Sequence, residues 1–191
     1  YRLKALPYPK YDTSFSNFAY PELWKELYPI ISDKSEDEMI RRIAMQMVRQ
    51  CKCDHNQVQD ELLRIALDQT EPGIIRDMAA YSIKRIGDDD HKTKLRPLAE
   101  GTVGEDPNDQ LKGHSLKCLW PNHLTAEELF VLLTEPKEHM YLGSYYLFLK
   151  ALPSNLPLSD LISALHWIRL ISEWHSMGPY WEVPEKIILQ C

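Results

Sequence analysis

The chain has 191 residues, of which 44% are hydrophobic, enough for a sizeable core in one elongated domain or two at most. It has 22 lysines and arginines against 28 aspartates and glutamates, so its formal net charge is 22 − 28 = −6. This balance excludes a chain-wide electrostatic surface for DNA, RNA or an anionic membrane. No apolar run reaches the roughly 18 to 20 residues that a membrane span requires.

The first 34 residues are rich in tyrosine, phenylalanine and proline, and only PELWKELYP within them has a helical pattern. We therefore expect an irregular aromatic cap or lead-in over residues 1–34. After it, Ser35 and Glu38 have the spacing of a capping box, which satisfies free amide groups at a helix start. An apolar stripe at helical spacing then predicts a helix through Met39, Ile40, Ile43, Ala44, Met47, Val48 and Cys51.

The next helices are separated by cap residues, prolines and glycines. Asp54 is expected to cap one helix. Pro72 and Gly73 are expected to break the chain before another helix, which ends at Gly87. The aspartates at 88–90 predict a solvated turn, and Pro97 interrupts a short helix beyond it.

The second half of the chain continues the helical pattern. A helix from about 108 to 120 is closed by Pro121, and Thr125 with Glu128 forms another capping box. An aromatic helix is expected over 141–152. Pro157 opens a longer helix whose predicted buried face consists of Leu158, Leu161, Ile162, Leu165, Ile168 and Ile171.

Three predicted helices share one residue pattern at spacings of 35 and 36 residues. Aligned from Ile40, Ile75 and Leu111, they place basic residues at Arg41, Arg76 and Lys112 and small residues at Ala44, Ala79 and Ser115. A period in this range without strand patterns is typical of a stacked two-helix repeat. The sequence predicts an all-α fold, an α-solenoid of about four helix pairs over residues 35–191, with Ala79 and Ala80 buried between adjacent layers.

The segment IIRDMAAYSIKRIGD resembles a HEAT-type repeat. The run Asp106–Leu156 is similar to the helical region downstream of the nucleotide-binding domain in bacterial NACHT-type STAND ATPases, signalling proteins of antiviral defence. The resemblance is carried by LKG with LKCLWP, by HLTAEELF, by PK and by an aromatic helix beginning GSY. The chain contains no Gly-x-x-x-x-Gly-Lys-Ser/Thr loop, so the resemblance implies that nucleotide binds outside these residues.

The resemblance implies a non-catalytic HEAT-like sensor or scaffold that recognises a protein trigger, including a phage-derived one, and so favours one arrangement of the ATPase. The chain begins at Tyr1 without methionine and ends at Cys191 inside an apolar helical pattern, which favours a segment of a longer protein. The alternatives are a free-standing helical-repeat adaptor and a nucleic-acid-binding HEAT-like protein.

The expected partners are therefore a protein or neighbouring domains of the same protein, with nucleic acid disfavoured and no membrane contact. No cofactor is expected in this chain, and the sequence leaves its oligomeric state open. Four cysteines in 191 residues are sparse for a secreted disulfide scaffold and fit a reducing cytoplasm.

The basic row Arg41, Arg76 and Lys112 admits two interpretations. It forms a structural ladder between layers, with Asp77 and Asp109 as acidic partners, or it lines a surface that holds an acidic partner. We favour the ladder, because a repeated position on paired helices normally serves stacking.

A second candidate surface is the loop WHSMGPYW, with Trp174, Tyr180 and Trp181. Aromatic residues on loops commonly anchor protein interfaces, and packing against a further repeat explains them equally well.

Cys51, Cys53 and His55 carry zinc-ligand chemistry, but a structural site needs a fourth ligand and usually longer spacers. We interpret them as one core cysteine and two turn residues. None of the seven histidines pairs recognisably in the sequence with a nucleophile and an orienting acid, so we expect no catalytic residue and no metal site.

Overall fold

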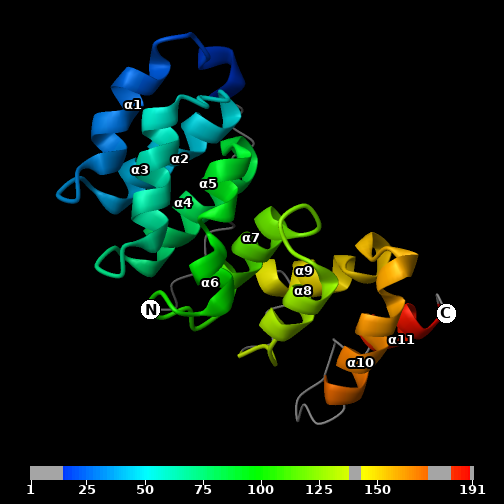
Figure 1. The fold of residues 1–191 in the computed structure, drawn as a ribbon. Helices are drawn as coiled ribbons and strands as arrows, with labels where there is room; N and C mark the ends of the chain where they lie inside the picture. Colours follow the sequence, from blue (N-terminus) through cyan, green and yellow to red (C-terminus); the bar gives the residue numbers. More distant parts are fainter. Residues whose placement is uncertain (1–14, 138–142, 172–181, 190–191) are drawn as a thin grey trace, which may run out of the picture.

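The computed structural model describes residues 15–137, 143–171 and 182–189, and within these ranges every regular element is a helix (Figure 1). The first part comprises η1 (Phe15–Phe18), α1 (Leu23–Ser32), α2 (Glu38–Gln50), α3 (Asn56–Leu67) and α4 (Gly73–Ile86). The short helices α5 (Asp89–Thr93) and α6 (Arg96–Glu100) precede α7 (Gln110–Leu119) and α8 (Ala126–Leu132). The last part comprises α9 (Ser144–Ala151), η2 (Pro153–Asn155), η3 (Leu158–Asp160), α10 (Leu161–Ile171) and α11 (Glu182–Ile188).

The helices are arranged along an elongated molecule, with α1 to α5 at one end and α10 and α11 at the other (Figure 1). Chain neighbours pack as helical hairpins in the pairs α1 with α2, α3 with α4, and α6 with α7. Alternate helices also touch, so that α2 packs on α4, α4 on α7, and α7 on α9. The second helix of each successive hairpin therefore lies beside the next one in an uninterrupted row. None of the described helices has the length and apolar character that crossing a bilayer requires.

The core consists of two apolar clusters that meet where α6 and α7 pack together. Leu23, Leu27 and Ile31 of α1 are buried in the same cluster as α2, α3 and α4. The helical pattern of PELWKELYP is confirmed as α1, whose leucine spacing buries one helical face. This helix therefore packs with the core formed by the helices after residue 34.

The predicted burial of Ala79 and Ala80 is confirmed, since both are fully buried on α4. Small side chains at this position allow α4 to approach its neighbours closely. On α7, two residues before Ser115, Gly113 permits a closer approach still. A Cβ atom there would lie 2.2 Å from the backbone nitrogen of Tyr145, at the start of α9.

The helix caps confirm part of the sequence analysis. Thr125 and Glu128 form the predicted capping box of α8. The predicted Ser35 box is wrong, because Asp37 caps α2 and accepts hydrogen bonds from the amides of Met39 and Ile40. A carboxylate one residue before the helix is better placed than the serine hydroxyl.

Two further cap predictions are corrected. His55, and not Asp54, caps α3, because its Nδ1 accepts the hydrogen bond from the amide of Gln57. Asp88 does not lie in a solvated turn but caps the short helix α5 through His91 N. The segment around Pro97 is accordingly two short helices.

The predicted buried face of α10 is only partly right. Ile171 is buried as predicted and Leu161 and Ile168 pack against the core, but Ile162 is 70% exposed. The other buried residues are Ala164 and Trp167. The indole of Trp167 stacks on Phe130 of α8, with ring centroids 5.4 Å apart. Burying this large ring rotates the helix away from the face that the aliphatic residues alone suggest.

Candidate interaction surface

The three residues of the basic row are buried and lie inside the helical stack. Arg41, Arg76 and Lys112 are 2%, 3% and 8% exposed. The interpretation that they line a surface for an acidic partner is therefore wrong, because a partner cannot reach them.

Arg41 and Arg76 make matching contacts. The Nε of Arg41 donates to the carbonyl of Ile31 at 3.1 Å, and the Nε of Arg76 donates to that of Ala66, also at 3.1 Å. Both carbonyls lie ten residues before the arginine, near the end of the preceding helix. Each guanidinium then reaches the following turn, Arg41 at Glu71 and Arg76 at the carbonyls of residues 103 and 105.

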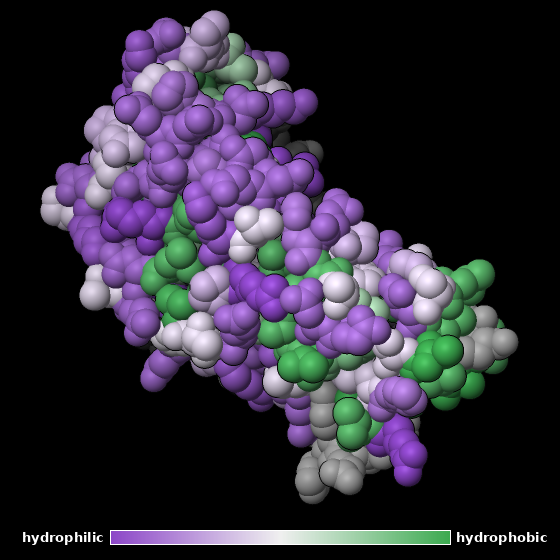
Figure 2. Space-filling view, viewed as in Figure 1, coloured by the Kyte–Doolittle hydropathy of each residue, from purple (hydrophilic) through white to green (hydrophobic). Residues whose placement is uncertain are grey.

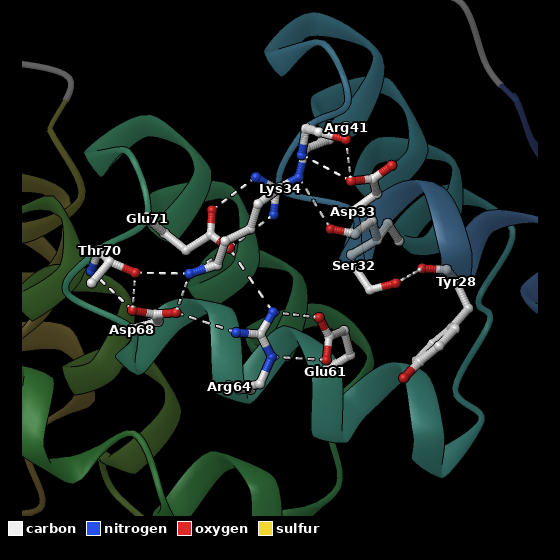
Figure 3. A network of polar contacts seen from close by, with 12 residues as sticks. Tyr28, Ser32, Asp33, Lys34, Arg41, Glu61, Arg64, Asp68, Thr70 and Glu71 are labelled. Carbon is white, nitrogen blue, oxygen red and sulfur yellow. Dashed lines mark hydrogen bonds and ion pairs between the residues drawn. The ribbon is translucent and has the colours of Figure 1, made fainter.

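The acidic partner of Arg41 is Glu71, and neither of the aspartates proposed from sequence pairs with it (Figure 3). Around this pair Lys34 donates to Asp68, and Arg64 bonds both Glu61 and Asp68. The ends of α1, α2, α3 and the turn before α4 are thereby held in one polar network (Figure 3).

Lys112, the third residue of the basic row, makes different contacts from those of the two arginines. Its Nζ donates to the hydroxyl of Thr134 at 2.7 Å and lies 5.3 Å from the ring centroid of Tyr145. Burial lowers the pKa of Lys112 to about 8. A lysine lacks the planar fork of arginine, so this position does not reproduce the two-sided arginine contact.

Trp174, Tyr180 and Trp181 lie outside the described residues. Beside them in the chain, several large apolar side chains are exposed on η3, α10 and α11. Figure 2 shows hydrophobic surface gathered over this end of the molecule, while the surface over α1 to α5 is mainly hydrophilic. The most exposed are Leu158, Ile162, Leu170 and Leu189.

Cys51 and His55 each use a possible ligand atom in another contact. The thiol of Cys51 donates to the carbonyl of Phe15 at 3.1 Å, and burial raises the pKa of the Cys53 thiol to about 11. The His55 ring stacks on Trp24 with centroids 3.7 Å apart, and its Nδ1 caps α3. The contacts of Cys51 and His55 agree with core and turn roles.

The structure brings together a serine, a histidine and an aspartate that sequence reasoning did not connect. His114 Nδ1 lies 3.0 Å from the hydroxyl oxygen of Ser144, and His114 Nε2 lies 3.1 Å from Asp77 Oδ1. The Asp77 contact has an ion-pair distance but not hydrogen-bond alignment. Spacing alone could not reveal the group, because it spans α4, α7 and α9.

These residue types recur in hydrolases, but access to the hydroxyl is closed here. Ser144 is 4% exposed, and the backbone of α7 at Gly113 lies directly against the first turn of α9. The hydroxyl also accepts a hydrogen bond from Lys117 Nζ at 3.1 Å. The geometry favours a polar link between three helices over an available nucleophile.

His91 forms a second polar link, between α3 and α5. Its Nδ1 lies 2.6 Å from Asp88 and its Nε2 lies 3.1 Å from Asp60. Burial alone would favour the neutral ring, but the hydrogen bonds to the two carboxylates raise the pKa of His91 above its ordinary value. Asp88, Asp90 and His91 lie close enough together to hold a metal ion, but both ring nitrogens of His91 already have carboxylate partners.

A row of cations with two aromatic rings lies along the second helices of successive hairpins. We call Arg49, Tyr81, Lys84, Arg85, His114 and Lys117 the Tyr81 row. The Arg49 guanidinium lies 4.7 Å from the Tyr81 ring centroid and the Lys84 Nζ lies 5.9 Å from it. The His114 ring stacks on Tyr81 with centroids 5.1 Å apart, which continues the row onto α7.

The four cations of the Tyr81 row form no ion pair with a described carboxylate, although the charge of Asp77 acts on Arg49 from a greater distance. Among the described residues, no carboxylate oxygen lies within 4.0 Å of Arg49, Lys84, Arg85 or Lys117. Burial, together with the neighbouring Lys84 charge, lowers the pKa of Lys117 to about 8. Burial and the Arg85 charge likewise lower the pKa of Lys84. The row is therefore a partly desolvated concentration of positive charge on an acidic chain.

No family model matches this chain, and searches of the curated proteins and of the solved structures find no match either.

Among the described surfaces, the Tyr81 row combines charge, aromatic character and placement across several helices. It differs from the predicted basic row by its exposure, since Arg85 is exposed and Tyr81 is half-buried. It is the surface of this chain most suited to a charged partner.

Proposed function

We propose that this chain is a HEAT-like helical-repeat segment that recognises a protein, and that it acts without catalysis as a sensor or scaffold. We propose this role because the run Asp106–Leu156 resembles the helical region of bacterial NACHT-type STAND ATPases. Recognition of a protein trigger, including a phage-derived one, in the cytoplasm would favour one arrangement of the whole ATPase over another.

The observation that carries the proposal is the matched pair of contacts made by Arg41 and Arg76. Each arginine sits 35 residues from the other and bonds a carbonyl ten residues earlier through Nε. Equivalent residues that make equivalent contacts in successive layers are expected of a structural repeat. The continuous packing of α2, α4, α7 and α9 supports the same interpretation.

The accessibility of the polar groups supports a binding role. The Ser144 hydroxyl, the nucleophile suggested by the Asp77 and His114 contacts, is closed off by the α7 backbone. The Tyr81 row, by contrast, offers charge on an accessible face. Repeat proteins commonly use such faces, built from several layers, to bind extended partners.

The proposal can be tested on the complete coding sequence that contains this chain. A phosphate-binding loop encoded before Tyr1 supports the ATPase assignment, because this chain has no such loop. An initiating methionine directly before Tyr1 would contradict it and favour the free-standing adaptor. Cells expressing the complete gene are then challenged with phages, with a disrupted phosphate-binding loop as the inactive reference.

A nucleic-acid-binding HEAT-like protein is the other alternative. The Tyr81 row provides four cations that form no ion pair with a described carboxylate, whereas phosphate-driven binding commonly uses on the order of 6 to 10 contacts. The net charge of −6 further opposes a polyanion. Protein recognition is therefore the better-supported function.

A further inference from the structure

The helices α4 and α7, which carry most of the Tyr81 row, have neutral or acidic residues at the start of this face and cations at its end. On α4, Ile74 and Asp77 precede Tyr81, and Lys84 and Arg85 follow it in the last turn. On α7, Gln110 precedes His114, and Lys117 follows in the last turn. Residues spaced three or four apart share a helix face, so each helix presents neutral or acidic groups first and cations last.

A hollow of about 280 Å³ lies at the first end. Ile74, Leu111 and Pro107 line it together with acidic groups that include Asp77 and Glu105. Asp77 also lies within ion-pair distance of His114, so this residue borders both the hollow and the Tyr81 row. The two features therefore form one continuous surface across α4 and α7.

The cations at the other end are stabilised only in part within the chain. Each of Arg49, Lys84 and Lys117 lies in the last turn of its helix, where the helix dipole favours a positive charge. The dipole allows the cluster to exist, but it places no carboxylate against it. Bringing acidic groups of a partner to this end would stabilise cations that are already partly desolvated.

We infer that the Tyr81 row and the adjoining hollow dock an acidic segment of a protein, with an apolar side chain in the hollow and carboxylates against Arg49, Lys84, Arg85 and Lys117. This inference rests on the proposed function of protein recognition and adds the chemistry of the partner. The apolar residue and the acids stand at opposite ends of the segment, because the hollow and the cations lie at opposite ends of α4 and α7.

The spacing within the segment follows from helix geometry. Ten residues separate Ile74 from Lys84, which corresponds to about 15 Å at a rise of about 1.5 Å per residue. An extended segment advances about 3.3 Å per residue, so its apolar residue stands about five positions from its acids.

A protein segment fits this surface better than a nucleic acid does. A nucleic acid carries a phosphate at every nucleotide and would meet Asp77 and Glu105 at the hollow. A protein segment can place its negative charges at one end only. The acids at the hollow thus select against a uniformly charged polymer and orient a peptide.

The test uses a fluorescein-labelled peptide as the probe, with a run of glutamates and one leucine about five residues from it on each side, so that either chain direction can bind. A second peptide has glutamine in place of every glutamate, and a third has serine in place of both leucines. Fluorescence anisotropy with the whole chain is expected to give saturable binding of the first peptide, weakened at least about tenfold in each of the other two.

Matched protein variants test whether probe binding depends on this surface or only on the overall charge of the chain. The double variant Lys84→Gln with Arg85→Glu is expected to weaken probe binding at least about tenfold. Lys84→Arg with Arg85→Lys keeps both charges and is expected to bind as the native chain does. Lys25→Glu reverses an exposed charge on α1 and is likewise expected to leave binding unchanged. Circular dichroism of each variant confirms that the helices are formed.

Three outcomes would overturn the inference. The first is no binding of the acidic probe at about 1 mM, where even weak recognition is detectable. The second is equal binding by the native chain and the Lys84→Gln, Arg85→Glu variant. The third is preferential binding of a short DNA duplex lost in the same variant, which would assign the surface to nucleic acid. Protection from phage by the complete gene is scored separately, so the recognition role can stand where this docking site fails.

Discussion

Arg41 and Glu71 form a two-point ion pair, with Nη1 to Oε2 at 2.8 Å and Nη2 to Oε1 at 3.1 Å. Their side chains are only 3% and 1% exposed. The pair joins α2 to the turn before α4, and Arg41 also bonds the end of α1. A planar guanidinium satisfied on both sides fixes the relative positions of these elements.

Replacing Glu71 with leucine is expected to destabilise the chain by about 3 to 5 kcal/mol, because Arg41 would keep a buried charge without its carboxylate. The free energy of unfolding is measured by urea denaturation. Glu38→Ala removes an exposed carboxylate 3.9 Å from Arg42 and is expected to cost at most about 1 kcal/mol. Equal effects of the two substitutions would show that the Arg41 pair does not hold the layers together.

Ala79→Leu is expected to cost about 1 to 3 kcal/mol, because α4 has no space for the added carbons at a fully buried position. Thermal unfolding followed by circular dichroism measures the change. The same substitution at the exposed Ala151 on α9 is the control and should alter the midpoint little. An unchanged midpoint for Ala79→Leu would mean that the 35-residue alignment has the wrong register.

Gly113→Ala is expected to destabilise the chain by at least about 1 kcal/mol, because the new methyl group would overlap the backbone of α9. Gly73 supplies the matched glycine, since a Cβ atom there meets no atom within 4 Å. Gly73→Ala should therefore stabilise the start of α4 by about 0.4 to 1 kcal/mol. Urea midpoints that shift in the same direction for both variants would contradict the close approach of α7 and α9.

His91 is expected to make stability fall as the pH rises above neutrality. The two carboxylates raise its folded-state pKa, so the folded chain binds a proton more tightly than the unfolded chain does. The stabilisation is complete below the unfolded pKa of about 6.5 and is lost as the pH rises through the higher folded value.

The measurement is the midpoint of thermal unfolding at a series of pH values from about 6 to 8.5, a range in which unperturbed carboxylates stay ionised. His91→Gln should lower the midpoint at the acid end of this series and flatten its decline. A decline of equal size in native chain and variant would assign the pH dependence to other groups.

The helices were largely predictable from sequence because apolar residues recur at helical spacing and breaks coincide with proline and glycine. Cap choice was less predictable, since Asp37 and His55 lie one or two residues after Ser35 and Asp54 and cap the helix starts in their place. The face of α10 depends on Trp167 finding Phe130 on another helix, a contact that periodicity does not encode.

The candidate surface was predictable only in part. The 35-residue spacing that aligns Arg41 with Arg76 also aligns Arg49 with Lys84, so one signal was present in the sequence. Whether a basic residue faces inward or outward depends on stacking, which buries Arg41 and leaves Arg85 exposed. The approach of His114 to Tyr81 joins two helices and required the structure.

The measurement closest to the central claim is phage protection by the complete gene that encodes this chain, with substitutions in the Tyr81 row. Lys84→Gln with Arg85→Glu is expected to reduce protection to the level of cells without the gene, at unchanged protein abundance. Lys25→Glu should protect as the native gene does. Full protection by the Lys84 and Arg85 double variant would contradict recognition through this surface.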